Sequence, residues 1–140
     1  MTHKVVTTWK KNLKFESDNP GGLTLTMDAS REVGGDDEGL RPKALMLSSL
    51  AGCSGIDVAS LFKKMRVEVD SYHIDVAGEL TEEHPKYYHT VTVGYHFYGS
   101  NLPKEKIEKA VNLSVERYCG VMEMFRRFAE MKIDIYYHEE

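Results

Sequence analysis

The chain has 140 residues, 41% of them hydrophobic, which is enough for one domain with its own core and too few for two. Its formal net charge of −4 gives no electrostatic reason to expect a nucleic acid or an anionic lipid surface as a partner. Residues 1–10 lack the continuous apolar segment of a secretory signal, so we expect a protein that stays in the cytoplasm.

Short strands are predicted in the first third of the chain, over residues 5–9, 13–16 and 23–27. In the third of these, apolar and polar residues alternate as they do along a strand with one buried face. The segment Asn19–Gly22 combines a proline with two glycines and is a strong turn signal. These features predict an antiparallel meander.

Residues 29–41 are charged, contain glycine and show no periodicity. Such a stretch is typical of a solvated surface loop, and a functional lid is the alternative. Pro42 is well placed as a first helical residue, and from Ala44 to Phe62 almost every residue is apolar or small. Because a helix of this kind has no solvated face, we expect it to be buried.

A membrane-spanning role for this helix is disfavoured by Asp57 and by the serines along it. Ala51, Gly55 and Ala59 recur at every fourth position, and Gly52 adjoins them. Small residues in this pattern would let another backbone approach the helix closely.

The second half of the chain predicts a β-hairpin over residues 72–80 and 87–97, with its turn at 81–86. A helix with one apolar side follows from Pro103, its period is interrupted around Cys119, and it restarts near Val121. An alternating strand over residues 131–137 closes the chain. Because strands are grouped rather than alternating with helices, the predicted class is α+β with mainly antiparallel pairing.

The two cysteines are too few for a disulfide scaffold. Cys53 lies in the apolar helix with Asp57 one turn further on, and Cys119 lies at the helix break. A helix N-terminus and the nearby Arg117 would favour a thiolate at Cys119. Glu123, on the same side of the second helix, could accept a proton or hold an arginine. The residues alone leave open whether the thiols are inert core groups or a redox pair.

The six histidines predict no metal site, because no two have the spacing of ligands within a helix or strand beside a cysteine or carboxylate. His89 shares a strand face with Tyr87 and Val91 and is expected to be a core or interface histidine, whereas His96 falls on the opposite face. Gly34-Gly35 lies in an acidic loop, which is the wrong charge for a phosphate-binding loop.

The segment Arg41–Cys53, a proline-initiated helix that ends in Ala51-Gly52-Cys53, resembles the central-helix motif of the OsmC/Ohr family. Four further segments resemble the YhfA-like branch of that family: Met27–Ser30 leading into Val33–Gly35, Ser54–Val58, Leu61–Arg66 and Glu116–Cys119. The resemblance covers nearly the whole chain.

This resemblance implies a single OsmC-like domain over residues 1–140, with antiparallel sheets packed on a long buried central helix. It also implies an interlocked homodimer with active sites near the subunit interface. In family members with peroxidase activity, the first cysteine reduces a hydroperoxide, the second condenses with the resulting sulfenic acid, and an external dithiol restores the pair. On this chain Cys53 would be the peroxidatic thiol and Cys119 the resolving thiol, with no metal or organic cofactor.

One departure concerns the residue ten positions before the first cysteine, where active family members carry a glutamate paired with an arginine. This chain has Lys43 there, and Arg31 and Arg41 are candidates for the arginine by neighbourhood alone. Two hypotheses therefore stand. The first is a thiol-dependent hydroperoxide reductase of low or altered activity that acts in oxidative stress. The second is a non-catalytic homodimer that binds an apolar ligand or a partner protein, or senses redox state.

Overall fold

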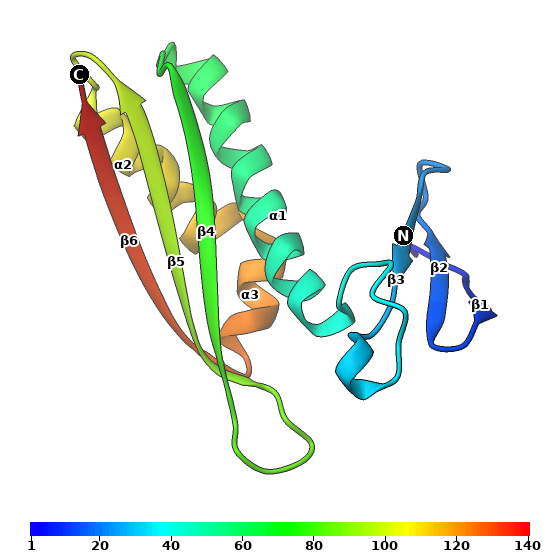
Figure 1. Ribbon diagram of the computed structural model, residues 1–140. Coiled ribbons are helices and arrows are strands. Elements are labelled where there is room, and N and C mark those ends of the chain that lie inside the picture. Colours follow the sequence, from blue (N-terminus) through cyan, green and yellow to red (C-terminus); the bar gives the residue numbers. More distant parts are fainter. The chain divides into compact units, whose positions relative to one another are not determined.

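The computed structural model describes all residues, 1–140, and divides into two compact units, Met1–Met46 and Leu47–Glu140. Each unit contains a three-stranded sheet, and the helices make the protein a mixed α+β structure (Figure 1). The predicted class is therefore confirmed, and the helices and strands lie within a few residues of their predicted positions.

The first unit begins with an antiparallel meander of β1 (Thr7–Lys11), β2 (Lys14–Asp18) and β3 (Thr24–Met27) in that order. The predicted turn between the last two strands is present. The backbone N–H of Gly22 donates to the carbonyl of Asn19 at 2.8 Å, with φ of Gly22 at 84°, a value that glycine adopts without strain.

The charged loop after β3 is ordered around a buried carboxylate. Asp28 is 2% exposed, and its side chain accepts the backbone N–H groups of Ala29 at 2.7 Å and Glu38 at 3.1 Å. A short 3-10 helix, Arg31–Val33, lies within the loop, and Lys14 of β2 pairs with Glu38 at 2.5 Å. The loop therefore has specific polar bonds that hold its shape, which the sequence did not predict.

The long helix α1 (Pro42–Met65) begins at the proline, as predicted. Its buried residues fall at every fourth position and form one stripe: Leu50, Ser54, Val58 and Phe62. Between these positions Ile56 is 73% exposed and Gly52 has open space around it. The prediction of burial all round is therefore wrong for the single chain, because the chain supplies packing partners for only one side of the helix.

The second unit is built on the sheet of β4 (Ser71–Leu80), β5 (Tyr88–Gly99) and β6 (Glu130–Glu139). Strands β4 and β5 form the predicted antiparallel hairpin, but β6 pairs with β5 in parallel. The connection between β5 and β6 contains helices that return the chain to the end where β5 began, so a parallel pairing results. This pair is the exception to the antiparallel pairing predicted from the sequence.

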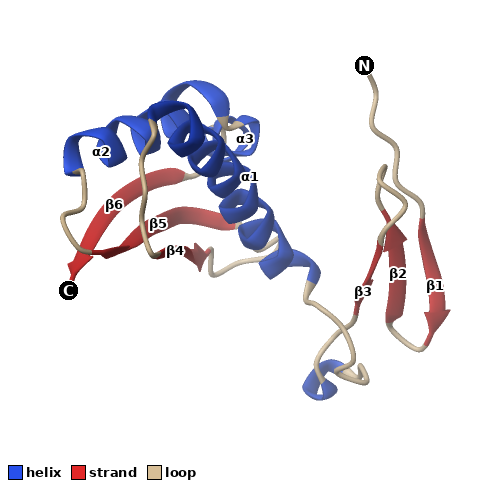
Figure 2. Cartoon of the chain, turned by 90° about the horizontal axis from the view of Figure 1, so that it is seen from above, coloured by secondary structure: helices blue, strands red, loops and turns tan.

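The connection consists of α2 (Lys104–Leu113), a π-helix (Ser114–Tyr118) and α3 (Gly120–Arg126). Figure 2 shows these helices and α1 on one face of the β4–β5–β6 sheet. That face carries the core, and the other face is open. The core residues with 0% exposure are Leu50, Val58, Val91, Val93, Tyr95, Phe97, Ile107, Ala110, Val111 and Met122.

Candidate thiol site

The π-helix sets the position of Cys119. The backbone N–H of Cys119 donates to the carbonyl of Ser114 at 2.8 Å, five residues back, which is the spacing of a π-turn. Cys119 then leaves the helical conformation, with φ at −78° and ψ at 102°, and caps α3. Its sulfur accepts the backbone N–H of Met122 at 3.3 Å. The predicted helix break is present, and Cys119 lies at the start of the second helix.

The two cysteines, far apart in the sequence, meet in the second unit. Cys53 comes from α1 and is half-buried, whereas Cys119 is 3% exposed, and both are free thiols. Cys53 acts on the Cys119 thiol both as a hydrogen-bonding neighbour and through its charge, so the two thiols lie close to each other. The pairing of helix α1 with the break after the π-helix thus produces a two-thiol site.

Burial raises the pKa of the Cys119 thiol to about 11. The Met122 N–H opposes this effect, and the neighbouring Cys53 adds to it. The helix N-terminus and Arg117 were expected to favour a thiolate at Cys119, and that prediction is wrong. Burial outweighs the single N–H bond, and Arg117 is exposed, with its guanidinium 5.9 Å from the Tyr118 ring centre. Cys119 is therefore a neutral thiol at pH 7.

A chain of buried hydroxyl groups lies beside the thiols. The Ser54 hydroxyl of α1 lies 2.6 Å from the Tyr95 hydroxyl of β5 and 2.7 Å from the Ser114 hydroxyl of the π-helix. Ser114 in turn donates to the Asp57 carboxylate at 3.0 Å. The Asp57 charge is close enough to act on both Tyr95 and Cys119. Three elements are therefore tied together next to Cys119.

The direction of these hydrogen bonds follows from proton counting. A carboxylate only accepts, so the single hydroxyl proton of Ser114 points to Asp57. Ser54 must then donate to Ser114, and Tyr95 must donate to Ser54. Burial raises the Tyr95 pKa to about 12, which keeps its proton in place at neutral pH. The chain thus runs from a phenol to a carboxylate, with every group satisfied.

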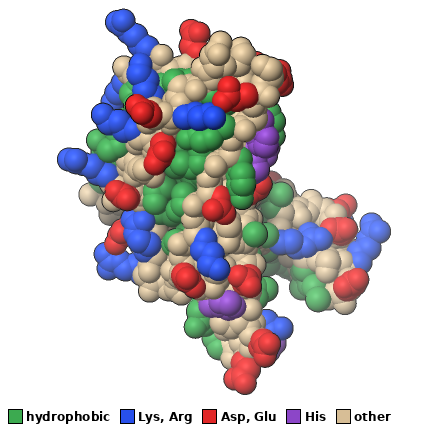
Figure 3. Space-filling view, turned by 90° about the vertical axis from the view of Figure 1, so that its left-hand side faces the viewer, with side chains coloured by type: hydrophobic (Ala, Val, Ile, Leu, Met, Phe, Trp, Pro, Cys, Tyr) green, Lys and Arg blue, Asp and Glu red, His purple; other side chains and the backbone are tan.

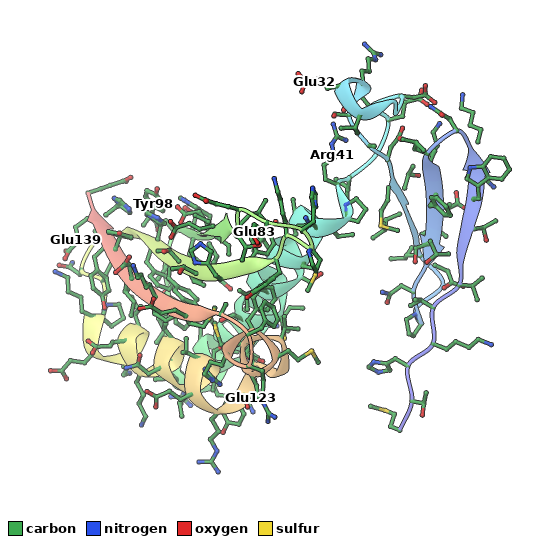
Figure 4. The ribbon with its side chains drawn as sticks, turned by 90° about the horizontal axis from the view of Figure 1, so that it is seen from below. Glu32, Arg41, Glu83, Tyr98, Glu123 and Glu139 are labelled. Carbon is green, nitrogen blue, oxygen red and sulfur yellow. The ribbon has the colours of Figure 1, made fainter.

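The other candidate residues from the sequence lie in different surroundings. Glu123 is exposed on α3, where its label stands in Figure 4, and it accepts bonds from Arg126 and Arg127 at 3.0–3.1 Å. The Arg126 and Arg127 bonds lower the Glu123 pKa. Lys43, in the first turn of α1, and Arg31, in the 3-10 helix, are exposed and belong to the first unit. Of the supporting residues, Asp57 alone acts on the Cys119 thiol.

Sequence reasoning missed Tyr95, Ser54 and Ser114 as members of the site. Tyr95 and Ser114 look like ordinary residues of a strand and a helix, and Ser54 was seen only as a polar interruption. The signal available in the sequence was that Ser54 and Ser114 each stand at a core position on an apolar helix face. A buried hydroxyl needs a hydrogen-bonding partner, so the two serines could have been expected to find one.

The sequence matches the family model described as OsmC-like protein over residues 35–134, which is more than half of the chain. The chain belongs to the OsmC-like protein family. It is 29% identical over 119 residues to protein YhfA of Escherichia coli K12, covering 85% of this chain and 86% of that protein. The family membership expected from Arg41–Cys53 is confirmed.

Solved structures agree with this membership. A hypothetical protein from Aquifex aeolicus superposes with a TM-score of 0.86 at 31% identity, covering 100% of this chain and 98% of that one. An organic hydroperoxide resistance protein OsmC from Legionella pneumophila superposes with a TM-score of 0.70 at 17% identity, covering 97% of both chains. The second likeness concerns the fold alone. OsmC-like proteins are soluble, and the structure is compatible with a soluble protein. Helix α1 is long and apolar enough to cross a membrane, but one such helix is weak evidence for a membrane span.

Proposed function

We propose that this OsmC-like protein is a thiol-dependent reductase of organic hydroperoxides, with Cys53 as the peroxidatic thiol and Cys119 as the resolving thiol. The observation that carries the proposal is the meeting of the two thiols from distant segments beside a polar network. A core cysteine that only fills space has no need of a second thiol within hydrogen-bonding reach.

The assignment of roles rests on the difference between the two thiols. A peroxide is attacked by a thiolate, and the buried Cys119, with a pKa of about 11, is neutral at physiological pH. Cys53 is the more exposed of the two and lies on α1, one turn before Asp57. Cys53 is therefore the group that meets the hydroperoxide, and Cys119 reacts second.

The proposed cycle balances as follows. The Cys53 thiolate attacks the outer oxygen of the hydroperoxide, the O–O bond breaks, and the alkoxide takes a proton to leave as the alcohol. The Cys119 thiol then attacks the Cys53 sulfenic acid, which forms the disulfide and releases water. An external dithiol reduces the disulfide by thiol exchange and is itself oxidised. No metal or organic cofactor takes part.

Lys43 stands where active family members carry a glutamate, so the activation of Cys53 must differ from theirs. We propose Lys43 and Arg31, which the sequence singles out, as candidates for the positive charge that would favour a thiolate. Asp57 has a separate role. Burial keeps the resolving thiol Cys119 protonated, and the negative charge of Asp57 adds a smaller effect in the same direction. Glu123 serves to hold Arg126 and Arg127 at the C-terminal end of α3.

We further propose that the whole chain acts as one OsmC-like domain in a cytoplasmic homodimer. OsmC/Ohr proteins are typically dimers. Support on this chain comes from α1, whose exposed side carries Ile56, Gly52 and Ala59. A second copy would cover these residues, and Gly52 has room for another backbone.

The test is a thiol count on the fully reduced protein after brief exposure to cumene hydroperoxide. We expect rapid loss of both thiols in the native protein, and a sulfenic acid at residue 53 in Cys119→Ser, detected as an added oxygen by mass spectrometry. In Cys53→Ser the remaining thiol should survive, because Cys119 is neutral and buried. Ser60→Ala, an exposed change on the same helix, should behave as the native protein.

Survival of both thiols in excess hydroperoxide would overturn the reductase proposal. The second hypothesis, a non-catalytic homodimer that binds an apolar ligand or senses redox state, would then stand. The absence of the activating glutamate favours that alternative, whereas the contact between the thiols favours chemistry.

A further inference from the structure

The open face of the β4–β5–β6 sheet carries a row of rings that the thiol site does not use. Residues on this face reach the surface, and histidine side chains are exposed at two separate places in Figure 3. His73 of β4 lies directly opposite His96 of β5, which in turn lies opposite Tyr136 of β6. The His73 and His96 rings stack at 4.6 Å, and so do the His96 and Tyr136 rings.

A carboxylate lies beside two of these histidines. Asp75 follows His73 by two positions on β4, so the two side chains share the open face. The Asp75 carboxylate lies 2.9 Å from Nε2 of His96. One nitrogen of each histidine and one oxygen of Asp75 all lie within 4.8 Å of one another. Three metal-binding side chains from two strands thus converge on one point.

Gly94 keeps the space at this point open. It lies opposite Asp75 in the middle of β5, where glycine weakens a strand. A Cβ atom at Gly94 would come within 2.6 Å of the Asp75 carboxylate oxygen and 3.3 Å of Nε2 of His96. A glycine inside a strand commonly marks the close approach of another group, and here the cleared space adjoins the converging atoms.

The orientation of His96 is fixed by its surroundings. Its ring is held between the rings of His73 and Tyr136, and its Nδ1 lies 3.0 Å from Nε2 of His138 on β6. In the metal-free protein Nε2–H of His96 donates to the Asp75 carboxylate, which only accepts. A metal ion would replace this Nε2 proton, and a proton on Nδ1 of His96 would then be donated to Nε2 of His138. Histidine ligands in proteins almost always have such a partner on the second nitrogen. Tyr98, labelled in Figure 4 on the face away from α2 and α3, stacks on His138 at 4.4 Å.

We propose that His73, Asp75 and His96 form a binding site for a divalent transition-metal ion of the zinc class, with His138 as a positioning residue. Imidazole nitrogens and a carboxylate oxygen are ligands that Zn²⁺ accepts at about 2.0–2.2 Å. Tetrahedral coordination then requires ligand atoms about 3.4 Å apart. The His96–Asp75 separation of 2.9 Å is close to this value, and the exposed side chains of His73 and Asp75 can rotate to meet it. The fourth position faces solvent.

This site is separate from the thiol site. Tyr95 and His96 are neighbours on β5, and successive strand residues point to opposite faces. Tyr95 therefore reaches the buried hydroxyl chain, whereas His96 reaches the open face. The sequence predicted no metal site because it considered ligand spacing within single elements, and here the third ligand comes from the neighbouring strand.

The test is a titration of the reduced, full-length protein with Co²⁺, followed by its visible absorption, and with Zn²⁺, followed by calorimetry. We expect one ion per chain, with a tetrahedral cobalt spectrum that lacks a thiolate charge-transfer band. His96→Ala and Asp75→Asn should each weaken binding by at least about 100-fold, and His138→Ala by about 10- to 100-fold. His89→Ala, an exposed histidine of the same strand, is the matched control and should bind as the native protein does.

Three results would overturn the proposal. They are the absence of stoichiometric binding, native affinity in His96→Ala, and a thiolate band that disappears in Cys53→Ser, which would place the ion at the cysteines. Because His73 is exposed and outside the core, His73→Ala provides a second ligand variant should His96→Ala fail to fold. Native affinity in that variant would count equally against the site.

Discussion

The two units of the chain are stabilised in different ways. In the second unit, Val93 and Phe97 are 0% exposed, and the sheet has a packed core beneath its helices. In the first unit, Trp9 is 61% exposed, Leu23 is 79% exposed and Val33 is 69% exposed. The second unit therefore contains its own hydrophobic core, whereas the first depends on its strand ladder and on polar bonds, and its apolar side chains remain available to a partner.

The pKa values of ionisable side chains also differ between the two units: they are lowered in the first unit and raised in the second. In the first unit, burial opposes ionisation of Asp28, but the N–H groups of Glu38, Ala29 and Asp36 together lower its pKa. The hydrogen bond from Lys14 lowers the Glu38 pKa. In the second unit, burial raises the pKa of Tyr95 to about 12 and that of Cys119 to about 11. In the first unit hydrogen bonds favour the ionised form of these side chains, whereas in the second unit burial favours the neutral form.

The largest expected effect is the loss of core packing in the second unit. Phe97 is fully buried and its ring packs 5.6 Å from Phe62 and 5.4 Å from Tyr72. Phe97→Ala should lower the free energy of unfolding by about 3–5 kcal/mol, because it leaves a cavity among the fully buried side chains of the core. Urea unfolding followed by far-UV circular dichroism measures this. Phe128→Ala, at a ring that is 40% exposed, is the matched control and should cost clearly less.

The hydroxyl chain should give the next largest effect. Ser114→Ala removes the group that bridges Ser54 and Asp57, which leaves a buried hydroxyl without its acceptor. We expect a loss of about 1–3 kcal/mol in the free energy of unfolding, measured in urea. Ser60→Ala, at an exposed position of α1, should change it by less than about 0.5 kcal/mol. Equal effects of the two changes would contradict the hydrogen-bond chain.

The dependence of stability on pH should separate the two units. Tyr95 and Cys119 have folded pKa values above their ordinary 10.0 and 9.0, so they stabilise the fold fully below about pH 9 and progressively less as the pH rises to about 12. Asp28 and Glu38 have lowered pKa values. Their contribution is present above their ordinary values of 3.8 and 4.5 and is lost as the pH falls through the folded values.

The single tryptophan of the chain allows the pH dependence of the first unit's stability to be measured. Trp9 is the only tryptophan of the chain and lies in the first unit, where its indole N–H donates to the Asn12 carbonyl at 2.8 Å. Its fluorescence should change first in acid. In Cys53→Ser, the rate at which Cys119 reacts with a thiol reagent, divided by its rate in the unfolded chain at the same pH, reports on the second unit. This ratio should rise first in alkali. If both signals changed together at both ends of the pH range, the two units would not differ as described.

A change on the surface of the first unit should have the smallest effect on the free energy of unfolding. The same change should have a clear effect on dimer formation. Leu23→Ser should change the unfolding free energy of a monomer by less than about 0.5 kcal/mol, since its side chain is 79% exposed. If this surface contacts a second copy, the same change should weaken the dimer, as measured by sedimentation. Lys4→Ser, at an exposed polar position of the same unit, should leave the oligomeric state unchanged.

Local patterns in the sequence predicted the helices and strands well. Alternation of apolar and polar residues, and the spacing of apolar residues along a helix, depend only on residues within one segment. The helix start at Pro42, the turn at Asn19–Gly22 and the break at Cys119 are all present. Features that depend on register between distant segments were missed. The hydroxyl chain needs Ser54 beside Tyr95, and the histidine row needs His73 opposite His96.

Two errors have a common physical cause. His89 is exposed in the single chain and bonds Thr90 at 2.8 Å, because the pairing of β4 with β5 shifts at Glu79–Leu80. The core position expected for it is therefore wrong, and the interface position stays a prediction. The thiolate expected at Cys119 is disfavoured by burial that only the tertiary fold creates. In both cases the residue's own segment was interpreted correctly, and the neighbouring segment decided its environment.

The π-helix before Cys119 has a consequence for how this protein tolerates changes in length. Its five-residue turn holds one residue more than an α-helical turn would. Deleting one residue from 115–118 would restore regular winding and rotate the following segment by about 100°. The thiol of Cys119 would then turn away from Cys53 even though every side chain of the site were retained. The length of this stretch therefore sets the direction in which Cys119 points. A shortened variant would lose the site because the Cys119 side chain is rotated, although every chemical group is still present.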